Sequence, residues 1–276
     1  MKGEVAELVA PRSVQCAPEL TFRAIEGLPK IQPGDDVTAL LILGLERQGF
    51  ALQQHDVVVV TSKIISKAED RYVDLAKVLP SPRARELALV TGGDPRVLEV
   101  VLWDTEIVSR SAKGALIVRH HGGHVSANAG LDQSNAQPAH APQGTGPWVL
   151  RLPAHPDTSA AALRTRLERH FRARLAVIVS DSFGRPFRLG TVGMAVGTSG
   201  LAALYDQRGR TDMHGRRLEH TLTATADQLC AAADLVCGQA DEGRPAVIVR
   251  GLRFDAPESS LGAKSLCRAA SEDLYL

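Results

Sequence analysis

Short β-branched runs spread along the whole chain constrain the fold more than any other sequence feature. Each run has the length of one strand and is bounded by charged residues, Gly or Pro. The runs span residues 57–61, 115–118, 175–180, 192–196 and 246–249. Helical patterns lie between them and no internal repeat is present. The sequence therefore predicts an α+β (mixed α/β) fold.

Apolar spacing predicts four helices in the intervening segments. Residues 82–90 and 96–103 form two of them, with a Gly-Gly pair between them. The third is amphipathic and is expected to begin at an N-cap formed by Asp157 or Thr158. The fourth is expected to end at Gly238, because glycine commonly terminates helices.

Residues 137–146 (QPAHAPQGTG) form the one compositional break and are typical of an exposed loop. We expect one domain over residues 1–276, in which this loop would join two lobes of about residues 1–136 and 147–276. The chain contains no G-x-x-x-x-G-K-[ST] sequence, and no G-x-G-x-x-G follows a strand. The expected two-lobed fold therefore has neither a P-loop nor a Rossmann motif.

Composition and charge exclude two classes of protein. The formal net charge is +1, with both signs interleaved, whereas a nucleic-acid-binding protein needs a basic face. The longest strongly apolar run, residues 39–45, is far shorter than the roughly 20 residues of a membrane span. Residues 1–15 lack the apolar segment of a secretory signal. We expect a cytoplasmic protein that binds neither nucleic acid nor a membrane.

The four cysteines, Cys16, Cys230, Cys237 and Cys267, show no Cys-x-x-Cys spacing. Cys230 and Cys237 lie in a helical pattern, where small buried thiols are the common arrangement. Neither a disulfide framework nor a zinc site is expected. This cysteine usage also agrees with a cytoplasmic location.

Three polar clusters follow or interrupt strand-like runs, at residues 128–135 (NAGLDQSN), 178–188 (IVSDSFGRPFR) and 238–245 (GQADEGRP). Asp181 comes directly after an apolar run, so we expect the strand to hold its carboxylate rigidly at the strand end. Oxygen ligands of this kind suit Mg²⁺ or Mn²⁺. The alternative is that these are ordinary turn residues, because Asp and Asn beside Gly are common in turns.

A fourth cluster, residues 61–67 (TSKIISK), follows the run at 57–60. Its hydroxyl and ammonium groups are suited to phosphate oxygens, although a solvated turn is the alternative. Arg185 and Arg188 lie close to Asp181 and could bind a carboxylate or phosphate in bidentate fashion. The alternative is that they form surface ion pairs with Asp212 or Glu219. For three further arginines, the functional interpretation and the ion-pair interpretation stay equally open: Arg208, Arg210 and Arg250.

These motifs, taken in order, resemble those of the coenzyme F420-0:L-glutamate ligases. The resemblance covers nearly the whole chain, and its long motifs NAGLDQSN and SDSFGRPFR are specific. The shorter motifs are EGLP at 26–29, SK at 62–63 and 66–67, RGRTD at 208–212, GQADEG at 238–243, VRG at 249–251, and a tail with GAKSLCR at 262–268 and EDL at 272–274.

The resemblance implies a GTP-dependent ligase that acts as a homodimer with two divalent ions, Mg²⁺ or Mn²⁺, and potassium as a further candidate. When the roles of the family's residues are transferred to the matching positions of this sequence, the metal ligands would be Asp132, Asp181, Ser182 and Gln239. Ser182 stands where the family usually has Thr and keeps the hydroxyl oxygen. Glu242 is the substitute for Gln239 if the register differs.

The same carry-over gives the catalytic and GTP-binding residues. Asp132, Asp181 and Arg185 would be catalytic. The GTP contacts would be Gly27, Leu28, Pro29, Lys30, Ser62, Lys63, Lys67, Asn135, Gly238, Gln239, Ala240, Asp241, Glu242, Gly243 and Arg244. Residues 137–146 look longer than the usual link of the family. No nitroreductase-like domain is appended, so a stand-alone ligase is expected.

The implied reaction transfers the γ-phosphoryl group of GTP to a carboxylate of coenzyme F420-0. The amine of L-glutamate then attacks the acyl phosphate and an amide forms; repetition would lengthen the γ-linked tail. Lys63 and Lys67 would assist as cations. The competing class is a metal-dependent nucleotide phosphohydrolase, in which the same carboxylates would activate water. A non-catalytic nucleotide sensor is a third class.

Overall fold

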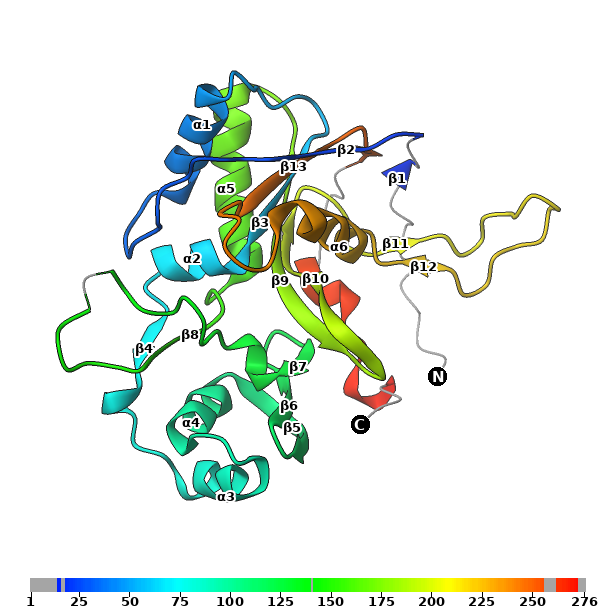
Figure 1. Cartoon of the computed structure of the whole chain (residues 1–276). Coiled ribbons are helices and arrows are strands. Elements are labelled where there is room, and N and C mark those ends of the chain that lie inside the picture. Colours follow the sequence, from blue (N-terminus) through cyan, green and yellow to red (C-terminus); the bar gives the residue numbers. More distant parts are fainter. Residues whose placement is uncertain (1–13, 16–17, 140, 256–261, 273–276) are drawn as a thin grey trace, which may run out of the picture.

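The computed structural model describes residues 14–15, 18–139, 141–255 and 262–272. The expectations for Cys16, for the N-terminal residues 1–13 and for the end of the family-like tail after Glu272 lie outside the described residues. Within them the chain folds as an α+β protein, as predicted, with one larger sheet and several small ones (Figure 1).

The larger sheet has five strands, and its apolar residues explain why it forms the centre of the molecule. In spatial order the strands are β10 (Arg188–Ser199), β9 (Ala176–Arg185), β3 (Val57–Thr61), β13 (Ala246–Arg250) and β2 (Thr21–Ala24). β3 and β9 are parallel, whereas every other pair is antiparallel. Residues 57–60 of β3, 176–179 of β9 and 246–249 of β13 are all apolar and buried, which is typical of strands covered on both sides.

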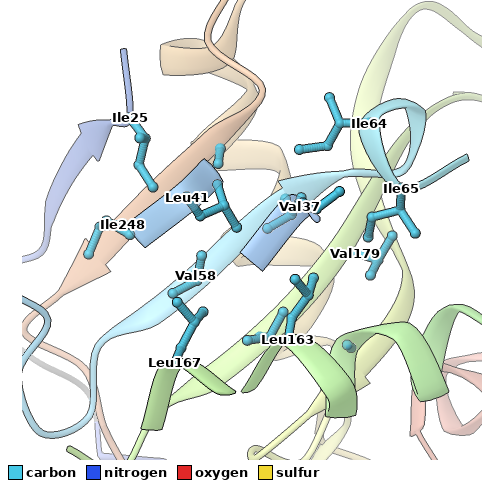
Figure 2. Packing of buried hydrophobic residues seen from close by; sticks show 14 of the residues in the cluster. Ile25, Val37, Leu41, Val58, Ile64, Ile65, Leu163, Leu167, Val179 and Ile248 are labelled. Carbon is cyan, nitrogen blue, oxygen red and sulfur yellow. The ribbon is translucent and has the colours of Figure 1, made fainter. Parts of the chain in front are cut away.

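Helices cover both faces of this sheet. α1 (Val37–Arg47), α2 (Ser62–Ala68) and α5 (Pro156–Phe171) lie on one face, and α6 (Thr225–Cys237) lies on the other. Because side chains alternate along a strand, Val58 packs with the first group of helices and Val57 with α6. Figure 2 shows Leu163 and Leu167 of α5 packed beside Val58.

A second group of elements lies below the larger sheet in Figure 1. It contains α3 (Pro82–Thr91), α4 (Pro95–Trp103) and a sheet of β5 (Thr105–Ala112), β6 (Ala115–His120) and β7 (Val125–Ala127), with a separate apolar core. The ribbon of β4 (Tyr72–Asp74) and β8 (Trp148–Leu150) lies between this group and α2.

The remaining elements are short. β11 (Tyr205–Asp206) and β12 (Leu222–Thr223) form the base of a long arm, and β1 (Val14–Gln15) pairs with β14 (Arg253–Phe254). The 3-10 turns are η1 (Leu75–Lys77), η2 (Asn128–Gly130), η3 (Gly262–Leu266) and η4 (Ala270–Glu272). In the described part of the chain, no helix has the length and apolar character needed to cross a membrane.

Three details differ from the sequence expectations. Asp181 lies within β9, not at its end, because pairing with β10 continues to Arg185. The N-cap prediction for α5 is wrong: the helix begins at Pro156, and Asp157 accepts hydrogen bonds from the backbone of Thr198 (2.7 Å) and Ala263 (3.0 Å). The larger sheet takes strands from both sides of residues 137–146, so a division into consecutive lobes there does not follow the sheet.

The other local predictions are confirmed. α6 ends at Gly238, which adopts a positive φ of 74°. Cys230 and Cys237 are free and buried on α6, and burial raises the pKa of both thiols, that of Cys237 to about 12. Such thiols are packing residues and not nucleophiles.

Candidate active site

The sequence clusters meet around one cavity of about 1100 Å³. Its walls come from the segment after β2, the junction of β3 and α2, the segment after β7, the middle of β9 and the segment after α6. Every residue predicted to bind metal or GTP lines this cavity, with the exception of Gly27. The structure therefore brings together clusters whose convergence the sequence spacing could not show.

Strand register brings the first two polar groups together. In the parallel pair β3–β9, Thr61 is opposite Ser180, so the next residues, Ser62 and Asp181, leave that pairing side by side. The hydroxyl of Ser62 donates a 2.8 Å hydrogen bond to Asp181 Oδ1. Burial, together with the negative charge of Asp132, raises the pKa of Asp181 to about 7.

Asp132 reaches the same place through an unusual turn. Asn128, Ala129 and Gly130 all have positive φ values, from 51° to 70°. A Cβ at Gly130 would lie 2.8 Å from Leu152 Cδ1 and 3.3 Å from Asp181 Oδ2, so only glycine allows this approach. Lys63 Nζ is 3.3 Å from Asp132 Oδ1. Burial nevertheless raises the pKa of Asp132.

Three lysines share the cavity with the two carboxylates. Lys30, Lys63 and Lys67 all line the cavity. Burial and the positive charges of Lys63 and Lys30 lower the pKa of the Lys67 ammonium group. Ammonium groups that repel one another in a shared cavity are stabilised by a bound anion, and phosphate oxygens are suited to this.

Ser182 and Gln239 form a further polar group with a residue that sequence analysis missed. Gln239 Nε2 donates a 2.9 Å hydrogen bond to Ser182 Oγ. The carboxylate of Asp234, on α6, is hydrogen-bonded to both of these side chains and to the backbone N–H of Gly193. The available signal was an acidic residue in the last turn of a helix, where the helix dipole disfavours negative charge.

The loop after α6 distinguishes the two alternatives for an oxygen ligand. The Glu242 carboxylate accepts a 2.9 Å hydrogen bond from the backbone of Ala240, which lowers its pKa. Arg244 pairs with Glu26 at 3.1 Å and holds the loop against the segment after β2. Since Glu242 is engaged within its own loop while Gln239 reaches Ser182, the contacts favour Gln239.

Apart from Arg244, the arginines that the sequence singled out do not line the cavity. Neither Arg185 nor Arg188 is among the residues that line the cavity, and Arg185 donates to Leu189 O at 3.1 Å. Arg208 pairs with Asp206, Arg210 donates to the Tyr205 hydroxyl and Arg250 pairs with Asp56. A catalytic role for Arg185 stays a prediction, since the hydrogen bond that its side chain donates goes to Leu189, which does not line the cavity.

A histidine packs behind the cavity wall. His124 stacks on Phe183 with ring centroids 5.0 Å apart, and also on His120 at 4.6 Å. Burial lowers the pKa of His124 to about 3, so the ring is uncharged at neutral pH. The stack supports Phe183, which lines the cavity directly after Ser182.

The oxygen groups fit a hard divalent cation. The described residues include no group of three or more His, Cys, Asp and Glu side chains arranged to hold a metal. The donors here are instead two carboxylates with raised pKa values, a hydroxyl and an amide oxygen. Mg²⁺ and Mn²⁺ use few carboxylates and complete their shells with water and phosphate oxygens. Asp132, Asp181, Ser182 and Gln239 would hold such ions.

Residues 27–251 match the family described as F420-0:Gamma-glutamyl ligase. The chain is 42% identical to the coenzyme F420:L-glutamate ligase of Methanopyrus kandleri, over 91% of this chain and 96% of the relative. It is 41% identical to the protein of the same name from Methanothermobacter thermautotrophicus, over 93% and 98%. The corresponding protein of Haloarcula marismortui is 39% identical over 91% and 93%.

Proposed function

The chain belongs to the F420-0:γ-glutamyl ligase family, and on this premise we propose that it adds L-glutamate to coenzyme F420-0 with GTP as phosphoryl donor. The chain is a ligase, as the family is. The nucleotide, the acyl-phosphate route and repeated γ-linked addition are the proposed parts. One observation carries the proposal: paired carboxylates and a group of lysines line a single cavity.

The positions of these charges suit phosphoryl transfer to a carboxylate. Lys63 and Lys67 bind the phosphates of GTP and neutralise charge that develops during transfer. Asp132 and Asp181 would hold divalent ions, which would supply Lewis-acid charge for the transfer. The acceptor carboxylate, once phosphorylated, has a good leaving group, and the amine of L-glutamate displaces phosphate to form the amide.

The experiment that tests this function measures phosphate release from GTP under four conditions: neither substrate, F420-0 alone, L-glutamate alone, and both. An acyl phosphate exposed to water would be hydrolysed, so a ligase excludes solvent until both substrates are bound. Phosphate release is expected to be slow in the first three conditions and to rise with both substrates, at about one phosphate per amide.

Equal phosphate release in all four conditions would establish the phosphohydrolase instead. GTP binding without turnover in any condition would establish a nucleotide sensor. Replacing GTP by ATP in the fourth condition tests the nucleotide, and mass spectrometry of the product counts the added glutamates. Potassium as a further cofactor and a cytoplasmic location stay predictions.

The homodimer is also part of the proposal. The β9–β10 hairpin and the arm between β11 and β12 project from the body, and they carry Leu189 and Met213, each 98% exposed. Exposed apolar side chains that lie close together on one projecting element, as Phe187 and Leu189 do on this hairpin, are typical of a surface covered by a partner. Light scattering on the purified protein should give twice the mass of one chain.

A further inference from the structure

In the described part of the chain, the cavity has one accessible aromatic surface, and it comes from the β4–β8 ribbon. Among the described residues that line the cavity, the aromatic ones are Tyr72, Trp148 and Phe183. Phe183 is only 4% exposed and stacks on His124. The rings of Tyr72 and Trp148, which are partly exposed, form a T-shaped pair with centroids 6.4 Å apart. They supply the flat surface that this cavity offers to a ligand.

The β4–β8 ribbon holds this pair rigidly. Trp148 is opposite Asp74, and the buried carboxylate of Asp74 accepts a 2.9 Å hydrogen bond from the backbone of Gly146. The backbone of Leu75 donates to Pro147 O at 3.0 Å. The end of the 137–146 loop is therefore fixed to η1, and Trp148 follows directly after this fixed point.

The same ribbon fixes the aromatic pair relative to Asp132. Asp132 and Leu150 exchange two backbone hydrogen bonds of 2.9 Å. Trp148 precedes Leu150 by two residues, which is about 7 Å along a strand. A ligand whose reacting group lies at Asp132 could therefore reach the Trp148 ring with a part that is on the order of 10 Å away.

The surroundings of the pair suit an uncharged ring system. The residues of the 137–146 segment and its flanks that line this end of the cavity are uncharged, among them Ala136, Ala139 and Thr145. The lysines suited to phosphate come from the segment after β2, which carries Lys30, and from α2, which carries Lys63 and Lys67. In Figure 1 the segment after β2 and the β4–β8 ribbon lie on opposite sides of α2.

We propose that Tyr72 and Trp148 form the subsite that stacks the deazaflavin ring of the acceptor, F420-0. This assignment rests on the proposed function. F420-0 carries a flat ring at one end and the carboxylate to be extended at the other, which matches the order of the ribbon from Trp148 to Asp132. The guanine ring of GTP lies elsewhere, on the side of the lysines.

The test compares equilibrium binding of F420-0 and of GTP to the whole protein by calorimetry. Stacking on an aromatic side chain is worth about 1–3 kcal/mol, so Trp148→Ala should raise the Kd for F420-0 by roughly 5- to 150-fold and leave the Kd for GTP unchanged. Trp148→Phe keeps a flat ring and should recover most of the affinity. Trp103, the other tryptophan of the chain, lies on α4 outside the cavity, so Trp103→Ala is the matched control.

Each outcome decides between alternatives. An unchanged Kd for F420-0 in Trp148→Ala, with normal binding to the wild type, overturns the subsite and leaves the ligase function intact. A raised Kd for GTP alone assigns the pair to guanine and likewise overturns the proposal. Failure of the wild type to bind F420-0 would overturn the proposed function itself. Thermal melting confirms that each variant is folded.

Discussion

Ser62 Oγ donates a 2.8 Å hydrogen bond to Asp181 Oδ1, although 119 residues separate them in the sequence. The bond exists because β3 and β9 are parallel and in register up to Thr61 and Ser180. It places the hydroxyl at the start of α2 against Asp181, whose pKa burial raises to about 7. The hydrogen bond therefore connects the start of α2 to the carboxylate on β9.

Asp181→Asn is expected to stabilise the metal-free protein above neutral pH and to abolish ligation. The pKa of Asp181 is raised from about 3.9 in an unfolded chain to about 7 by burial and by Asp132. A raised carboxyl pKa means that the wild type loses stability as pH rises from about 4 to 7. Asparagine removes that loss and can still accept the bond from Ser62.

Urea unfolding in EDTA at pH 4 and pH 8 measures this effect. The variant should be more stable than the wild type at pH 8, and the difference should disappear at pH 4. Added Mn²⁺ should raise the Tm of the wild type only. Retained ligation, or an equal response of both proteins to Mn²⁺, would contradict the role of Asp181 as a metal ligand.

Lys67→Ala is expected to weaken GTP binding by about 1–3 kcal/mol, the range of a hydrogen bond to a charged group. Burial and the charges of Lys63 and Lys30 lower the pKa of Lys67, and a bound phosphate would relieve the repulsion among the three lysines. Isothermal titration with GTP measures the change. Lys113→Ala, in the exposed β5–β6 turn, is the control. Equal dissociation constants for the two variants would remove Lys67 from the GTP site.

Much of the fold and part of the site could be predicted from local sequence. The strand at 57–61 and the helix end at Gly238 follow from residue type and spacing, and the structure confirms them. Which strands pair, however, depends on long-range packing, so neither the Ser62–Asp181 bond nor the position of Arg185 outside the cavity could be derived. Asp157 shows the same limit. A local rule predicts that its side chain caps α5, but the carboxylate instead accepts hydrogen bonds from Thr198 and Ala263, which are distant in the sequence.

Gly130→Ala tests the close approach of residues 128–135 to Asp181. An L-residue with positive φ costs roughly 1–2 kcal/mol, and the added Cβ would also lie 2.8 Å from Leu152 Cδ1. Gly114 has a similar φ of 81° with nothing within 4 Å, so Gly114→Ala carries the backbone cost alone. Gly130→Ala should lose more stability than this control in urea unfolding, and only Gly130→Ala should weaken Mn²⁺ binding. Equal losses would mean that residues 128–135 shift without cost.

Asp234→Asn tests whether the carboxylate that sequence analysis missed orients Ser182 and Gln239. The Asp234 carboxylate accepts from the Ser182 hydroxyl, from Gln239 and from the backbone of Gly193. An acceptor there directs the hydroxyl proton of Ser182 away from the cavity and leaves its oxygen lone pairs for a cation. An amide can present its NH₂ group instead, so Asp234→Asn should weaken Mn²⁺ binding by about 10- to 100-fold, the usual effect of losing a group that orients a metal ligand.

Asp227 on the same helix provides the matched control for this variant. Its carboxylate also accepts from a backbone N–H of β10, that of Ala195 at 2.9 Å, and its pKa is likewise raised by burial. Asp227 does not line the cavity, so Asp227→Asn should change stability and leave Mn²⁺ affinity as in the wild type. Calorimetric titration with Mn²⁺, without nucleotide, separates the two variants. Equal Mn²⁺ affinities would show that Asp234 only fastens α6 to β10, whereas a selective loss in Asp234→Asn would make it a positioning residue of the metal site.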